Sequence, residues 1–144
     1  MTKPAQNPSI QDTFNSEHID SATLHLDGAR GLLMLLQNTL EPNGEQLSTP
    51  KAVGIMATVQ SLIYWTHTDL EKDSQINGHD WVDVLLWLNG ITGALSVLHG
   101  GHNGLYDLPN NRIQQATLHS LQTVIGEAID YIESIWAVTT KGSV

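Results

Sequence analysis

The fold follows from residues 81–98, which read WVDVLLWLNGITGALSVL. Apolar side chains recur there at alternating three- and four-residue spacing, at Trp81, Val84, Leu88, Ile91, Leu95 and Leu98. This spacing places them on one side of an α-helix and is typical of a helix that packs against other helices at a shallow angle. The segment therefore predicts a core helix of a helical bundle.

Three further segments carry the same spacing. Their apolar positions are Ile19, Ala22, Leu26, Ala29, Leu33, Leu36 and Leu40; Ala52, Ile55, Val59, Leu62 and Thr66; and Leu118, Leu121, Ile125, Ala128, Ile132 and Ile135. Connections of about six to thirteen residues separate the segments and favour antiparallel neighbours. We therefore expect an all-α fold, a four-helix and mainly antiparallel bundle with a disordered N-terminal tail.

Residues that start or end helices divide the chain. Thr49 and Pro50 suit the N-cap and the first position of a helix, and Asp80 can cap the next one. Gly100 and Gly101 are expected to end that helix, because glycine tolerates the left-handed conformation. The expected helices cover about residues 16–40, 49–70, 80–100 and 111–138. The expected organisation is a polar tail over residues 1–15, a single domain over 16–139 and a flexible C-terminus over 140–144.

Composition excludes several classes of function. The chain of 144 residues has a net charge of -9 and no cysteine, which removes disulfides, cysteine-ligated zinc and thiol catalysis. The six Lys and Arg residues are scattered, which argues against direct nucleic-acid binding, since such binding neutralises phosphates. The apolar run at residues 84–98 is shorter than the ~20 residues of a membrane span. We expect a cytoplasmic protein with no membrane contact.

The third expected helix carries apolar residues beyond its core positions. No Asp, Glu, Lys or Arg occurs at residues 52–68 or 84–106. A helix on the outside of a monomeric bundle has a polar face, so this helix either is surrounded by others or lies in an interface. We favour a homodimer formed by the apolar faces of the second and third helices, with the small Gly90 and Ala94 allowing close approach. The predicted interface residues are Trp65, Val82, Leu86, Trp87, Gly90, Ala94 and Val97.

An acidic segment between the second and third helices suggests a metal site. Residues 69–80 read DLEKDSQINGHD and hold carboxylates at the spacing of calcium-binding helix-loop-helix loops, although Ser74 stands where such a loop needs glycine. A transition metal could instead be held by histidine–carboxylate pairs spaced four residues apart on the two helices. His79 and Asp83 fall on the outer side of the third helix, however, and this favours ordinary surface histidines. The candidate metal ligands are His67, Asp69, Glu71, Asp73, His79, Asp80 and Asp83.

No sequence motif in the chain identifies a particular reaction or ligand. A nucleophile elbow, a Walker-type phosphate loop and a dinucleotide fingerprint are all missing from the sequence, and no cofactor is predicted. We expect a non-enzymatic helical interaction or regulatory module, with a second copy of itself or another protein as its partner. One alternative is an acidic inhibitor or immunity-type protein that covers a basic surface of a nuclease or nucleic-acid-binding protein. The other is a metal-binding enzyme or sensor at the corner between the second and third helices.

Overall fold

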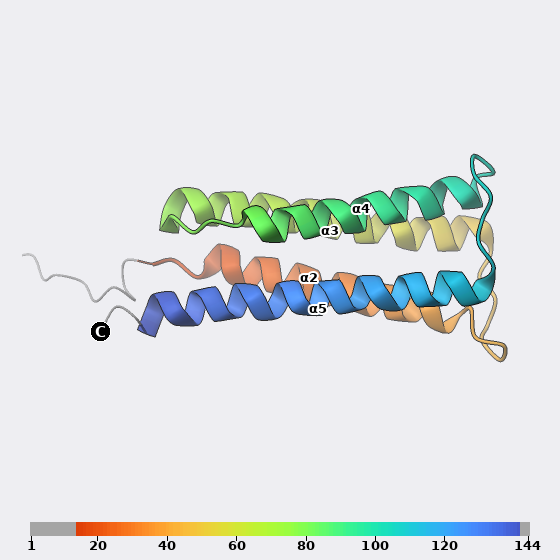
Figure 1. Ribbon diagram of the computed structural model, residues 1–144, viewed down its shortest axis with the longest axis horizontal. Coiled ribbons are helices and arrows are strands. Elements are labelled where there is room, and N and C mark those ends of the chain that lie inside the picture. The colour runs from red at the N-terminus through yellow and green to blue at the C-terminus, as the bar shows by residue number, and fades with distance from the viewer. Residues whose placement is uncertain (1–13, 142–144) are drawn as a thin grey trace, which may run out of the picture.

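The computed structural model describes residues 14–141, and the described chain contains helices and no β-strand. The helices are α2 (Glu17–Asn38), α3 (Thr49–Asn77), α4 (Val82–His102) and α5 (Asn111–Lys141). Successive helices run in opposite directions, and α3 with α4 forms one layer that lies on α2 and α5 (Figure 1). The predicted all-α, four-helix, antiparallel bundle is confirmed.

Most of the apolar positions that the sequence pattern indicates lie in the core, but Leu40 and Ile135 are only partly buried and the register of α3 differs. In α4 every predicted core position from Trp81 to Leu98 is buried. In α3, Met56 and Ile63 lie in the core, whereas the predicted positions Ile55 and Leu62 are only partly buried beside it. Both members of each neighbouring pair are apolar, so the spacing alone allows two registers. The buried side of α3, which continues through Leu70 and Asp73, has the register that includes Met56 and Ile63.

Helix α3 extends beyond its predicted end near residue 70. Leu70 and Asp73 continue its buried side, so the helical spacing persists through the acidic segment. The helix ends at Gly78, which has a φ of 79° and donates its backbone N–H to the carbonyl oxygen of Ser74. The prediction that the helix ends near residue 70 is therefore wrong, and residues 71–77 are helical.

Helix α4 continues through Gly100 and Gly101 to His102, so the prediction that these glycines end the helix is wrong. They instead allow the following loop to lie against the helix. A Cβ atom on Gly100 would stand 2.7 Å from the ring of Tyr106, and one on Gly101 would stand 2.9 Å from Cδ1 of Leu108. Close approach of the loop, rather than helix termination, explains both glycines.

The expected flexible ends lie mostly outside the described residues, which begin at residue 14 and end at residue 141. Phe14 and Asn15 are described and contact the bundle. The ring of Phe14 stacks on His79, and the backbone of Asn15 exchanges two hydrogen bonds with the side chain of Asn77. Phe14 and Asn15 therefore pack on the bundle ahead of α2, and α5 continues to Lys141.

Candidate functional site

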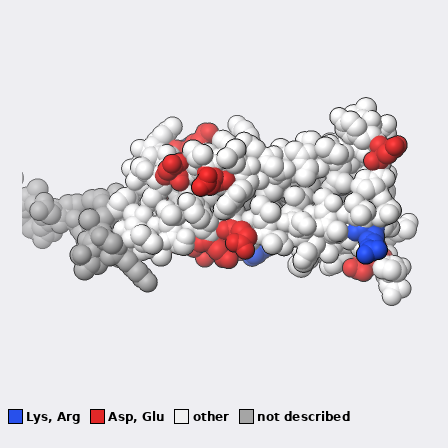
Figure 2. All heavy atoms as spheres, viewed as in Figure 1, with Lys and Arg blue, Asp and Glu red and all other residues white. Residues whose placement is uncertain are grey.

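The outer side of α4 presents an uncharged apolar stripe. Val82, Leu86 and Val97 are 59%, 62% and 58% exposed, and their spacing places them with Gly90 and Gly93 in one narrow sector of the helix. We call these five residues the α4 stripe. Figure 2 views the molecule from the side on which α4 and α5 lie in front, and few charged atoms cover the middle of this side. The alternative that α4 is surrounded by other helices is therefore wrong for the described chain.

The glycines of the α4 stripe are not needed for packing within the described part of the chain. A Cβ atom on Gly90 or Gly93 would meet no atom of the described chain within 4 Å. Glycine inside a helix costs about 0.5–1 kcal/mol relative to alanine. Ala94, which was predicted to allow a close approach, is partly buried and packs against the core. Gly93 was not predicted, although it lies three residues after Gly90 and shares its face.

The predicted interface tryptophans lie at opposite edges of the layer formed by α3 and α4. The ring of Trp65 lies 5.7 Å from the ring of His25 on α2. The ring of Trp87 lies 5.8 Å from the ring of Tyr131 on α5. Because α2 borders α3 and α5 borders α4 (Figure 1), one partner helix cannot cover both tryptophans. Trp87 lies beside the α4 stripe, whereas Trp65 belongs to the edge between α2 and α3.

Continuation of α3 to Asn77 removes the calcium-type loop. The carboxylates of the acidic segment project in different directions around the helix instead of wrapping one point. Asp73 is fully buried, whereas Glu71 is exposed and its carboxylate lies 3.1 Å from Nδ1 of His67. In the described chain, no group of three His, Asp or Glu residues is arranged to hold a metal ion.

Asp69 joins α3 to α2. Its carboxylate accepts a hydrogen bond from the hydroxyl of Ser21 at 2.9 Å and lies 2.9 Å from Nδ1 of His25. Nδ1 of His18 is 3.9 Å from its other oxygen. All of these side chains are at least half-buried, so the contact connects two helices rather than forming an open ligand site.

Asp73 is the centre of a buried polar cluster where α3 ends and α4 begins. Its carboxylate accepts hydrogen bonds of 2.7 Å from Nε1 of Trp81 and from Nδ2 of Asn77, and it lies 2.7 Å from Nδ1 of His79. Nε2 of His79 lies 2.8 Å from Oγ1 of Thr139 on α5. The prediction that His79 is a surface residue is wrong, because this residue precedes α4 and does not follow the helical spacing used to place it.

Thr139, His79 and Asp73 have the hydroxyl–imidazole–carboxylate order of a catalytic triad. The hydroxyl of Thr139, however, also donates to the carbonyl oxygen of Ile135 at 2.8 Å. It lies near the C-terminal end of α5, where the free backbone groups are carbonyls and not the N–H donors that an oxyanion requires. The cluster therefore connects three segments of the bundle and lacks the parts of an acyl-transfer site.

Asp80 and Asp83, the remaining candidate ligands, stand at the start of α4. The carboxylate of Asp80 accepts the backbone N–H of Val82 at 3.0 Å, although the N-cap position of α4 is occupied by Trp81 and not by Asp80 as predicted. Asp83 is exposed in the first turn, where a carboxylate interacts favourably with the positive end of the helix dipole. Both residues have a local role in starting the helix.

Comparison with known proteins gives no match to a protein family, a curated protein or a solved structure. One helix of the described chain, α4, is long and apolar enough to cross a membrane by length and composition. Core helices of soluble proteins, which are mostly buried, pass the same test, and 28% of the apolar window of α4 is buried inside the bundle. The geometry of the bundle is therefore the basis for a functional proposal.

Proposed function

We propose that the protein is a non-enzymatic interaction module that acts as a homodimer, with the α4 stripe of each chain packed against that of its partner. The observation that supports this proposal is a contiguous, exposed and uncharged apolar surface, which in soluble proteins marks an interaction site. Two copies of a chain with a net charge of -9 repel each other over most of their surface. The residues of the α4 stripe carry no charge, so the repulsion between two chains is small there.

The order of residues along α4 suits a twofold interface. A twofold axis brings the same patch of both chains together, so the patch must be complementary to itself. In an antiparallel pair of α4 helices centred between Ile91 and Thr92, Leu86 faces the partner's Val97. Gly90 then faces the partner's Gly93 at the centre of the pair. Large side chains would flank a crossing point at which two glycines let the backbones approach closely.

Aromatic residues border the α4 stripe on both sides. Trp87 lies toward α5 and is supported by the ring of Tyr131. Tyr64 is exposed on α3 and lines the groove between α3 and α4. Tryptophan and tyrosine are enriched among the residues that contribute most to binding energy. These two side chains would extend the contact beyond a single helix.

Light scattering coupled to size exclusion tests the proposal. We expect the wild-type protein to have twice the 15.8 kDa mass of one chain at micromolar concentration. Leu86→Asp should give the mass of one chain with unchanged helix content, because Leu86 is exposed and would place a carboxylate in the contact. Leu24→Asp is the matched control, since Leu24 is 72% exposed on α2. A wild-type monomer, or a dimer that survives Leu86→Asp, would refute the proposal.

The acidic-inhibitor alternative has no specific geometric support. Glu127, Asp130 and Glu133 are exposed along α5, as expected for the solvated face of a surface helix. Binding to a basic protein would give association rates that fall steeply with salt, and the proposed apolar homodimer would not. Measurement of this salt dependence separates the two.

A further inference from the structure

A cavity lies at the end of the bundle where α2 and α4 end and α3 and α5 begin. Its volume is about 140 Å³. Apolar side chains from all four helices form part of its wall, namely Leu36, Ala52, Met56, Leu98 and Leu118. An engineered apolar cavity of about 150 Å³ in another protein binds benzene. The size of this cavity therefore suits a molecule with a single ring.

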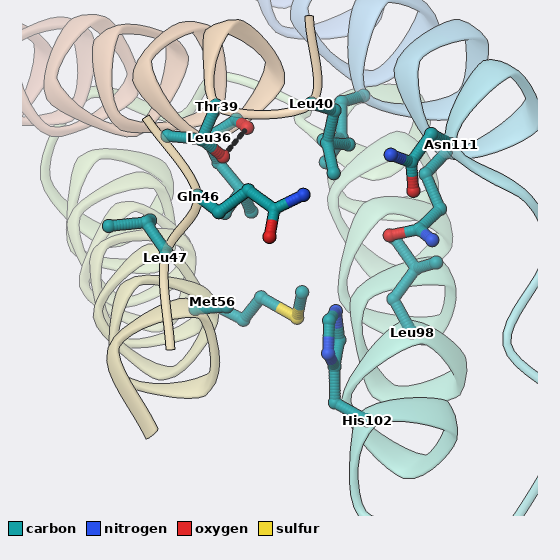
Figure 3. Close-up of a pocket in the computed structure, with 12 residues that line it drawn as sticks. Leu36, Thr39, Leu40, Gln46, Leu47, Met56, Leu98, His102 and Asn111 are labelled. Atoms are coloured by element: carbon teal, nitrogen blue, oxygen red, sulfur yellow. Dashed lines mark hydrogen bonds between the residues drawn. The ribbon is translucent and has the colours of Figure 1, made fainter. Parts of the chain in front are cut away.

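Polar side chains also form part of the wall, and Thr39 and Asn111 are among them. Gln46 comes from the loop between α2 and α3, His102 from the end of α4 and Gln114 from α5. Figure 3 shows the side chains of Gln46 and His102 directed into the same space, beside Met56. Neither Gln46 nor His102 has a side-chain hydrogen bond within the described residues. Convergent polar groups set among apolar side chains are typical of a small-molecule site.

Gln114 contributes an acceptor of fixed orientation. It is buried, and its Nε2 donates a hydrogen bond of 2.7 Å to the carbonyl oxygen of Pro109. A carbonyl can only accept, so this bond identifies the nitrogen of the side-chain amide. The amide oxygen of Gln114 has no partner among the described residues. An occupant with an O–H or N–H group could donate to it.

The cavity favours an uncharged occupant. His102 is the one titratable side chain in its lining. Burial, and secondarily the nearby His99, lowers the pKa of His102 below its ordinary value of 6.5, so the ring is neutral at pH 7. A charged ligand would lose its hydration here without gaining an opposite charge.

We propose that this cavity binds an uncharged, single-ring aromatic molecule that carries one hydrogen-bond donor, such as a phenol. The ring would lie among the leucines and Met56, whose flexible thioether makes favourable contacts with aromatic edges. The donor would bind the amide oxygen of Gln114. This site lies at one end of the bundle, apart from the middle of α4, so the proposal holds whether or not the chain forms a dimer.

NMR titration of the full chain with phenol, benzene and benzoate tests the proposal. Phenol should saturably shift the backbone amide signals of Met56, Leu98 and Leu118, and it should bind about tenfold more tightly than benzene, as expected for one hydrogen bond. Benzoate, which is charged, should give no saturable shift. Three results would each overturn the proposal: no saturable binding of phenol, shifts that map elsewhere, or benzoate binding equal to that of phenol.

Two variants connect binding to the cavity. Ala52→Leu should fill the cavity and abolish phenol binding, whereas Ala57→Leu, at an exposed position on the same helix, should leave binding unchanged. Gln114→Met serves as a second test should Ala52→Leu fail to fold. It removes the acceptor and should bring the affinity for phenol down to that for benzene, with benzene binding retained. A tenfold preference for phenol that survives Gln114→Met would refute the assignment of the acceptor.

Discussion

The indole nitrogen of Trp81 donates a hydrogen bond of 2.7 Å to the carboxylate of Asp73, which is fully buried. This bond connects the start of α4 to the last turns of α3. Asn77 and His79 contact the same carboxylate. A buried carboxylate is tolerated only when hydrogen bonds replace its hydration. The corner between α3 and α4 is therefore held by side chains, and it depends on one acidic residue.

Asp73→Ala should strongly destabilise the protein. The substitution leaves the indole N–H of Trp81 and the imidazole of His79 buried without their acceptor. Loss of one member of such a buried group typically costs about 3–5 kcal/mol. Urea denaturation followed by circular dichroism measures the change in the free energy of unfolding. Glu71→Ala, two residues earlier on the exposed side of α3, is the control and should change stability by less than about 0.5 kcal/mol. Equal effects of the two variants would contradict the structural role of Asp73.

Thr139→Val tests the connection from His79 to α5. Valine has the shape of threonine but cannot pair with Nε2 of His79, which lies 2.8 Å from the threonine hydroxyl. We expect a loss of about 1–2 kcal/mol in the free energy of unfolding. Thr123→Val on the same helix is the control, because the exposed hydroxyl of Thr123 bonds only the carbonyl of His119. If both variants lose the same amount, the contact with His79 contributes nothing.

The sequence predicts the architecture well because burial imposes a spacing that can be read without coordinates. Trp81 and Leu98 bound a set of core positions that the structure confirms throughout. The same spacing also extends through Leu70 to Asp73, and this was the available sign that α3 is longer than predicted. The acidic composition of the segment suggested a loop instead. Burial of Leu70 and the hydrogen bonds to the buried Asp73 outweighed that local preference.

The sites were predicted less well because they depend on residues outside regular helical spacing. His79 lies in a short connection, where helical periodicity says nothing about direction. The neighbours of Trp65 and Trp87 depend on which helices adjoin, and the sequence leaves the handedness of the bundle open. The cavity beside His102 forms from five separate segments, so spacing within one helix could not indicate it. The exposed stripe of α4 was predictable because its lack of charge is visible in the sequence.

Acidification should weaken the fold through His102. Burial lowers the pKa of this imidazole in the folded state below the 6.5 of an ordinary histidine. As the pH falls below 6.5, the unfolded chain binds a proton at this histidine more readily than the folded chain does. The free energy of unfolding therefore decreases. His102→Asn should reduce this pH dependence, whereas His119→Asn, at an exposed position on α5, should not. Urea denaturation between about pH 5 and pH 8 measures the pH dependence of the free energy of unfolding. Identical pH profiles for the wild-type protein and His102→Asn would contradict the prediction.

Gly93→Ala should separate the stability of the bundle from that of the dimer. A Cβ atom here meets nothing in the described chain, so alanine should stabilise α4 by about 0.5–1 kcal/mol through helix propensity alone. In the proposed dimer the same atom lies where two helices cross, so we expect the dissociation constant to rise about tenfold. Gly54→Ala on α3 is the control, since its Cβ is equally unobstructed and lies outside the α4 stripe. It should stabilise the chain without changing dimerisation. A Gly93→Ala protein that is more stable and dimerises as well as the wild type would show that the chains do not meet at this glycine.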